Sequence, residues 1–248
     1  LAVASDAEPV LRPRLLLRHK PSAHSTVALL ARPALADDVS RLAPVDAWAG
    51  RALLSSLGLA AGGFSQSYEA QYQLQPADGS LLRVTLFQRD LRNVLVDLED
   101  PAWSVEASPE VLAKVRLRGI EAEYERWLTS RLSGGVYVRW AGSKNQDAGD
   151  ADVPYQPSLV AQARLDYLDD AGWRVGLVWQ HTGRRYADLA NTTRLESYNT
   201  LGLSVARQFD LHTDVFVMVE NLLDEEYQFY RGYPERGRQV TVGLRHRF

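Results

Sequence analysis

The sequence has no cysteine and a single methionine, Met218, in 248 residues. The absence of cysteine excludes disulfide frameworks, thiolate metal sites and cysteine nucleophiles. No apolar run approaches the ~20 residues of a membrane-spanning helix, which excludes a helical membrane protein. The 28 basic and 31 acidic side chains leave a formal charge of −3. This balance gives no electrostatic reason to expect a nucleic-acid partner.

Motifs of enzymes and metal sites are also missing. The sequence has no Gly-x-Ser-x-Gly elbow, no P-loop and no Gly-x-Gly-x-x-Gly, and its five histidines form no His-Glu-x-x-His pair. We therefore predict no catalytic residues, no cofactor and no resident metal, and expect that the protein is not an enzyme.

What the sequence does have is strand-like alternation of apolar and polar residues. Along Trp173–Gln180, Leu177 falls on an aromatic and aliphatic face, whereas Gln180 falls on the opposite one. A second strand places Glu121 and Glu123 together on one face. Carboxylates in a dry core are costly, but facing a water-filled lumen they cost little. The alternation therefore favours strands with one apolar side and one wet side.

The predicted strands are joined by connections that alternate between short and long. Tight turns and long loops at opposite ends are typical of a meander barrel in an outer membrane. The fold class is therefore all-β, an antiparallel meander of about eleven transmembrane strands. The predicted strands are residues 10–19, 24–32, 65–75, 80–91, 114–127, 131–142, 157–168, 172–183, 196–207, 212–221 and 237–248.

The C-terminal segment Val219–Phe248 resembles the end of a TonB-dependent outer-membrane receptor. The matching residues are Asn221, Leu222, Asp224 and Tyr227, then Gly232, Tyr233, Pro234, Gly237 and Arg238, then the final Phe248; Leu223 stands where the family usually has phenylalanine. Other stretches that resemble the same family are Ser65–Gln73, Leu81–Asp97, Arg118–Trp140, Val153–Tyr167 and Gly183–Asn191.

This resemblance implies that the chain is the C-terminal half of a barrel of about 22 strands with a plugged lumen. Within a partial barrel domain of residues 1–248, we expect a first hairpin at 10–33, a long irregular loop at 34–64 and regular strands at 65–248. The odd strand number agrees with a half, because bacterial single-chain barrels close with an even number. A plug domain is not recognised in the chain.

The resemblance also implies a function and its partners. The family takes up scarce ligands, most often ferric siderophores, across the outer membrane of Gram-negative bacteria with energy delivered through TonB. Expected partners are TonB and the plug domain through the missing N-terminal part, the ligand, outer-membrane lipid, and the barrel-assembly machinery through the strand that ends at Phe248.

Two long loops combine aromatic and cationic side chains, which suit anionic iron chelates through cation–π contacts and charge-assisted hydrogen bonds. The competing interpretation is an interfacial aromatic girdle with turn-stabilising contacts. The candidate substrate-binding residues are Arg184, Arg185, Tyr186, Tyr230, Arg231, Tyr233 and Arg236.

Two alternatives to energised uptake remain open from the sequence. A passive porin-like or adhesion barrel would show the same strand pattern. A soluble β-sandwich that acts as a binding module would share the composition, although nothing in a sandwich sorts its loops by length.

Overall fold

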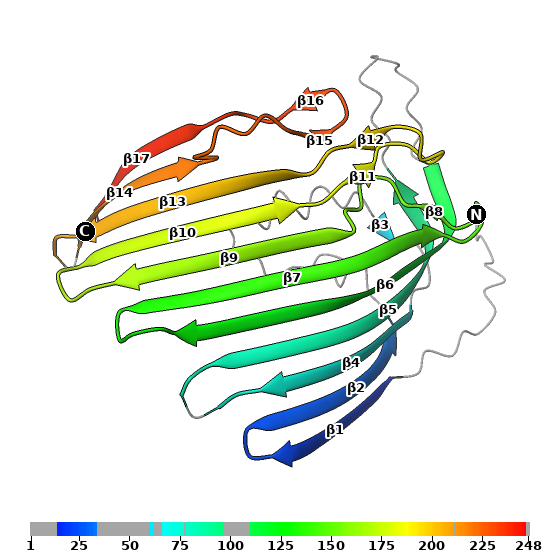
Figure 1. Cartoon of the computed structure of the whole chain (residues 1–248), viewed down its shortest axis with the longest axis horizontal. Helices are drawn as coiled ribbons and strands as arrows, with labels where there is room; N and C mark the ends of the chain where they lie inside the picture. The colour runs from blue at the N-terminus through cyan, green and yellow to red at the C-terminus, as the bar shows by residue number, and fades with distance from the viewer. Residues whose placement is uncertain are drawn as a thin grey trace, which may run out of the picture.

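The computed structural model describes residues 14–33, 60–61, 66–76, 78–96, 110–210 and 212–246. Within these ranges, eleven long strands follow one another in a single antiparallel sheet, each hydrogen-bonded to the next long strand (Figure 1). In order they are β1 (Leu15–Ser22), β2 (Ser25–Pro33), β4 (Gln66–Leu74), β5 (Leu81–Val96), β6 (Glu110–Trp127), β7 (Leu132–Asn145), β9 (Leu159–Leu168), β10 (Trp173–Thr182), β13 (Tyr198–Gln208), β14 (Thr213–Glu220) and β17 (Gln239–His246).

The described residues also include six short strands that accompany this sheet. Two extend it, and the others form two small hairpins in the long connections. They are β3 (Ala60–Ala61) beside β5, β8 (Ala151–Asp152) beside β7, β11 (Arg185–Tyr186) with β12 (Arg194–Leu195), and β15 (Gln228–Tyr230) with β16 (Tyr233–Pro234).

The predicted fold class is confirmed, and the sandwich alternative is wrong because the long strands form one continuous meander.

The first strand lies further along than the predicted 10–19: β1 includes Pro21, with a register irregularity between His19 and Ser22. Proline is tolerated there because β1 is an edge strand of the described sheet. β5 continues beyond the end of the predicted strand 80–91, and β6 begins before the start of the predicted strand 114–127. The predicted loop 34–64 lies outside the described residues apart from β3.

The short turns lie at one end of the sheet and the longer connections at the other (Figure 1). Three of the short turns contain an aspartate that accepts backbone N–H hydrogen bonds: Asp78 from Ser80, Asp169 from Trp173, and Asp210 from Thr213. Such side chains fold the chain back locally. We call the two ends the short-turn end and the long-connection end.

The two faces of the sheet differ in chemistry. On the outer face, apolar side chains are exposed, among them Leu86 (55%), Trp140 (65%) and Val242 (69%). The inner face instead buries polar groups such as Glu69 and Arg139. This arrangement inverts that of a water-soluble sheet. Among the described residues, no helix is long and apolar enough to cross a membrane.

Candidate functional site

Arg185 joins two long connections at the long-connection end. It is 3% exposed, and its Nη2 donates hydrogen bonds to the carbonyl oxygens of Gln228 (2.5 Å) and Phe229 (3.0 Å). Its guanidinium also lies over the rings of Phe229 and Tyr198, 5.2 and 5.5 Å from their centroids. Burial lowers the pKa of this guanidinium, opposed by the nearby Tyr198 and Tyr155. Arg185 therefore holds the β10–β13 connection against the β14–β17 connection.

Aromatic rings pack around this contact. Tyr155 and Tyr230 meet edge-on with centroids 4.9 Å apart, and Tyr198 stacks on Tyr227 at 4.0 Å. Burial raises the pKa of the Tyr227 phenol to about 12, assisted by Tyr198 and Glu235. These rings and Arg185 form one packed unit, which we call the loop cluster: Tyr155, Arg185, Tyr198, Tyr227, Phe229 and Tyr230.

Two of the predicted site residues, Arg185 and Tyr230, therefore lie in the loop cluster. Arg184 is exposed and its Nε lies 3.3 Å from a carboxylate oxygen of Glu196. The other four predicted residues lie at the same end: half-buried Tyr186 in β11, and exposed Arg231, Tyr233 and Arg236 in and beside the β15–β16 hairpin. Their role in ligand binding stays a prediction.

An open groove of about 520 Å³ runs along the inner face of β9, β10 and β13 toward the loop cluster. Gly176 and Gly202 leave space in the groove because they have no side chain. A Cβ at Gly176 would lie 2.6 Å from Ser204 Oγ. The side chains that line the groove include amides, which both donate and accept hydrogen bonds, and both acidic and basic groups. The polar lining residues include Gln162, Arg164, Gln180, Tyr227, Glu235 and Arg236.

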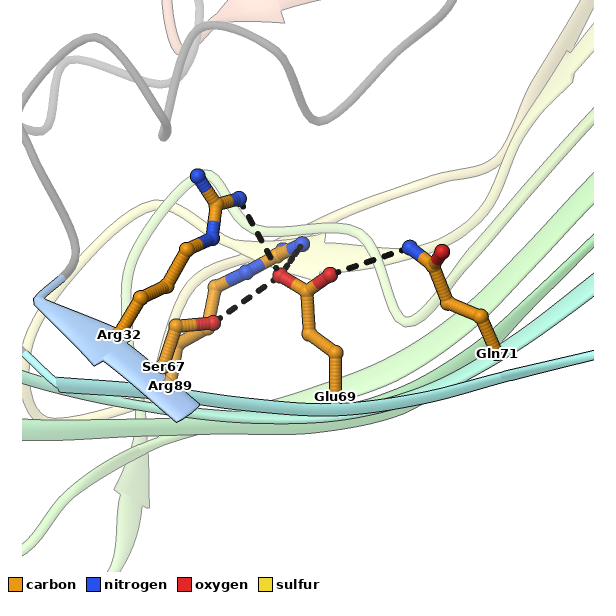
Figure 2. A network of polar contacts seen from close by, with 5 residues as sticks. All are labelled: Arg32, Ser67, Glu69, Gln71 and Arg89. Atoms are coloured by element: carbon orange, nitrogen blue, oxygen red, sulfur yellow. Dashed lines mark hydrogen bonds and ion pairs between the residues drawn. The ribbon is translucent and has the colours of Figure 1, made fainter. Parts of the chain in front are cut away.

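A buried polar network covers the inner face of β2, β4 and β5 (Figure 2). Glu69 Oε1 accepts a hydrogen bond from Ser67 Oγ (3.0 Å) and lies 3.5 Å from Arg32 Nη2 and 3.7 Å from Arg89 Nη2. Its Oε2 accepts from Gln71 Nε2 at 3.3 Å. Figure 2 shows all five side chains on the same side of the strands. Glu69 is 8% exposed and Arg89 is 7% exposed, so the ion pair is shielded from water.

The charged surface continues across β6 and β7. Glu123 pairs with Arg83 at 2.6 Å, while Glu121 stands opposite Arg139 in the strand register. Three buried atoms of this surface have no hydrogen-bond partner among the described residues: Arg89 Nη1, Glu121 Oε1 and Arg139 Nε. Leaving buried charged groups unsatisfied is costly. These groups therefore keep unused hydrogen-bonding capacity on the inner face.

The sequence reasoning did not select these inner-face residues as site residues. The available sequence feature was the polar alternation of Ser67, Glu69 and Gln71 along β4. The alternation predicts on which face each of these side chains lies. It does not predict that Arg32 and Arg89 contact Glu69, because these two residues lie on neighbouring strands and only the strand register places them there.

The C-terminal motif has a structural role. Asn221 has φ 49° and is 7% exposed, and its side chain both donates to and accepts from the backbone of Glu225 at 3.0 Å. Asp224 Oδ1 accepts the Arg238 N–H at 2.8 Å, and a Cβ at Gly237 would lie 2.8 Å from that oxygen. The motif thus anchors the start of β17 to the end of β14.

Among the described residues, no group of three His, Asp or Glu side chains is placed to hold a metal ion.

Comparison with known proteins identifies the family. The model of the TonB dependent receptor-like β-barrel matches residues 64–222. This chain belongs to the TonB-dependent receptor β-barrel family. It is 31% identical over 200 residues to the ferrioxamine receptor of Yersinia enterocolitica, covering 72% of the chain and 27% of that receptor. The chain therefore spans about a quarter of that relative's length. The family consists of receptors and transporters rather than enzymes.

Solved structures agree on the fold. A ferric enterobactin receptor variant from Pseudomonas aeruginosa superposes with a TM-score of 0.69 at 16% identity, covering 96% of this chain and 40% of the receptor. A siderophore receptor from Acinetobacter baumannii gives 0.68 at 15%, covering 99% and 38%. A copper transporter gives 0.64 at 14%, covering 93% and 38%. Because these identities are low, they establish the barrel fold and leave the cargo open.

Proposed function

We propose that this chain forms the C-terminal part of the barrel wall of an outer-membrane receptor that imports a ferric siderophore with energy delivered through TonB. The observation that carries this proposal is the 31% identity to a ferrioxamine receptor. The exposed apolar outer face supports a location in the outer membrane of a Gram-negative bacterium, because lipid solvates what water would not.

The inner face supports a plug domain as the partner inside the barrel. The buried atoms Arg89 Nη1, Glu121 Oε1 and Arg139 Nε lack hydrogen-bond partners among the described residues. A polar domain seated in the lumen would supply them, and burial of such groups is tolerated when they are paired. TonB would act through that domain and make no contact with this chain.

Ligand recognition is proposed at the long-connection end. Arg184, Arg231, Tyr233 and Arg236 expose cationic and aromatic groups there, and Arg236 also lines the inner groove. Anionic iron chelates suit such groups. Arg185 and Tyr230 would act by fixing the loops, since their described contacts are to other loop residues. Assembly into the membrane would use β17 and the C-terminal residue Phe248, which lies outside the described residues.

Iron uptake tests the proposal directly. The receptor that contains this chain is expressed in an iron-starved strain lacking its own ferrioxamine receptor, and uptake of radioactive iron as ferrioxamine is measured with and without TonB. We expect uptake that disappears when TonB is deleted. Flux that persists without TonB would indicate the passive porin-like barrel, and uptake of copper but not of ferrioxamine would overturn the siderophore assignment.

A further inference from the structure

The open groove of the inner face continues into a second cavity toward the short-turn end. This cavity has a volume of about 410 Å³ and shares Asp166, Gly176 and Ser204 with the groove. Together the two follow the inner face from Thr200 to Ala206, which is roughly 20 Å along a strand. We call this continuous depression the inner lane; its floor residues are Gly176 and Gln180 of β10 and Thr200, Gly202, Ser204 and Ala206 of β13.

The inner lane is open because its floor side chains on β13 are small. Alternate residues of β13 point inward, and from Thr200 to Ala206 they are threonine, glycine, serine and alanine. A Cβ at Gly202 would have no atom closer than 3.8 Å. Packing between the strands therefore does not require glycine at this position. What the missing side chain provides there is space in the lumen.

The neighbouring inner face of β5, β6 and β7 is filled instead. Val153, in the connection between β7 and β9, is fully buried in one apolar cluster with Leu91 and Leu117. Its backbone N–H donates to the carbonyl oxygen of Ser143 at 3.1 Å, which holds the connection against β7. A solute that enters from the long-connection end would therefore meet packed apolar groups over β5–β7, whereas the inner lane beside them is open.

The polar groups of the two regions also differ in what they require. Arg89, Glu121 and Arg139 are buried with unused hydrogen-bonding capacity, which is costly unless a further group pairs with it. In the described part of the chain, none of the buried side-chain atoms without a partner belongs to a residue that lines the inner lane. Lane side chains such as Gln162 and Gln180 are half-buried, so water can satisfy them. The lane therefore needs no permanent occupant.

Charged side chains in the inner lane lie beside opposite charges. Arg164 Nε is 2.8 Å from a carboxylate oxygen of Asp166, and Arg174 Nη2 is 3.9 Å from one of Asp214. Paired charges attract a passing ion less than isolated charges do. A transport path has to hold its solute weakly enough to release it. Paired charges with neutral amides and hydroxyls between them meet that requirement.

We propose that the inner lane is the part of the barrel wall along which the iron chelate moves during import. The lane opens beside Tyr227, Glu235 and Arg236 at the long-connection end, and Arg236 is one of the residues proposed to recognise the ligand. From there, amide and hydroxyl groups offer the chelate successive hydrogen bonds in exchange for water. This inference rests on the proposed function and assigns its transport step to β9, β10 and β13.

The test obstructs the inner lane in the whole receptor that contains this chain. Thr200→Trp places an indole in the lane, and the control Gln73→Trp places the same group on the inner face of β4. Both positions lie in one row of the strand register, joined through Arg83, Glu123, Tyr137, Gln162 and Gln180. In an iron-starved strain lacking its own ferrioxamine receptor, Thr200→Trp should slow TonB-dependent uptake of radioactive ferrioxamine iron by about tenfold or more, because an obstructed path adds a barrier. Gln73→Trp should not slow it.

Two further measurements separate obstruction from other causes. Binding of ferrioxamine iron to cells that lack TonB should be the same for both variants and the unaltered receptor. Exclusion of a large hydrophilic antibiotic should also be unchanged; a Thr200→Trp receptor that admits the antibiotic would show that the lane is a seat of the plug domain, and the inference would be wrong.

Uptake at the full rate by Thr200→Trp, or equal slowing by Gln73→Trp, would likewise overturn the inference. Heat-dependent electrophoretic mobility reports whether each variant forms a barrel. Gly202→Trp replaces Thr200→Trp if the latter does not form one, and the same results are expected. An unaltered receptor without TonB-dependent uptake would instead contradict the proposed function.

Discussion

The two faces of β10 differ sharply in chemistry. On the outer face, Leu177 stands between Leu165 and Leu203 of the adjacent strands. Three residues further along, Gln180 stands on the inner face between Gln162 and Thr200. Along β10 the apolar side faces outward and the polar side inward, whereas farther along the inner face of the sheet Phe87, Leu91 and Leu117 belong to a buried apolar cluster. The following predictions test that contrast, from the largest effect to the smallest.

Arginine substitutions on the two faces of β10 should have unequal consequences. Leu177→Arg places a charge on the outer face, which would cost roughly 2–4 kcal/mol near the centre of a bilayer if this face meets lipid as proposed. Gln180→Arg is the matched control on the wet side. We expect the amount of folded receptor in the outer membrane, measured by heat-dependent mobility after fractionation, to fall sharply for Leu177→Arg alone. Equal tolerance would contradict the assignment of faces.

Removal of the central carboxylate of the inner network should be the next largest effect. Glu69→Ala leaves Arg89 buried without its nearest carboxylate, and an unpaired buried charged group costs about 2–3 kcal/mol. We expect the free energy of unfolding in denaturant to fall by that amount. Glu125→Ala is the control, because the Glu125 side chain is 49% exposed and its ion pair should contribute less than about 1 kcal/mol. Similar losses for both would indicate a hydrated inner wall.

Loss of Arg185 should loosen the loops without unfolding the strands. Arg185→Ala removes two hydrogen bonds and two cation–π contacts, which together contribute about 1–2 kcal/mol to holding the connections. Faster hydrogen exchange is expected at residues 183–197 and 222–236. Arg184→Ala, which removes an exposed neighbour, should leave exchange there unchanged. Unchanged exchange in Arg185→Ala would show that the aromatic rings suffice.

The smallest expected effect is on pH dependence. Burial raises the pKa of Tyr227 to about 12, from an ordinary value of 10.0. Since the folded state holds this proton more tightly, its stabilising contribution is complete below pH 10 and is lost as pH rises through 12. Tyr227→Phe should remove a late-titrating component from the absorbance at 295 nm. If Tyr227→Phe instead removes a component that titrates at about pH 10, the Tyr227 phenol is exposed to water.

Much of the fold follows from the sequence because strand alternation and turn residues are local. Residues 172–183 were predicted as a strand and β10 occupies Trp173–Thr182. The extension of β5 to Val96 was missed. The second half of β5 departs from apolar–polar alternation, because the charged Asp90 and Arg92 lie on the outer face while Leu91 is buried on the inner face.

Less of the candidate site could be predicted, because its contacts join distant residues. The sequence predicts a candidate site in the loops that carry Arg185 and Tyr230 because they are rich in cationic and aromatic groups, but it does not predict that Arg185 bonds a carbonyl 44 residues away. Likewise, the partners of Glu69 come from β2 and β5. Local patterns indicate which residue types gather at an end or on a face. They do not show which side chains the fold will bury.

Site-directed spin labelling tests the central claim of two opposed faces most directly. The chain contains no cysteine, so it adds no labelling site of its own when single cysteines are introduced from Trp173 to Thr182 in an otherwise cysteine-free receptor reconstituted in lipid bilayers. We predict that labels at 175, 177 and 179 are accessible to oxygen, whereas labels at 176, 178 and 180 favour a water-soluble nickel reagent. An accessibility that does not alternate, or that alternates in the opposite phase, would contradict the account.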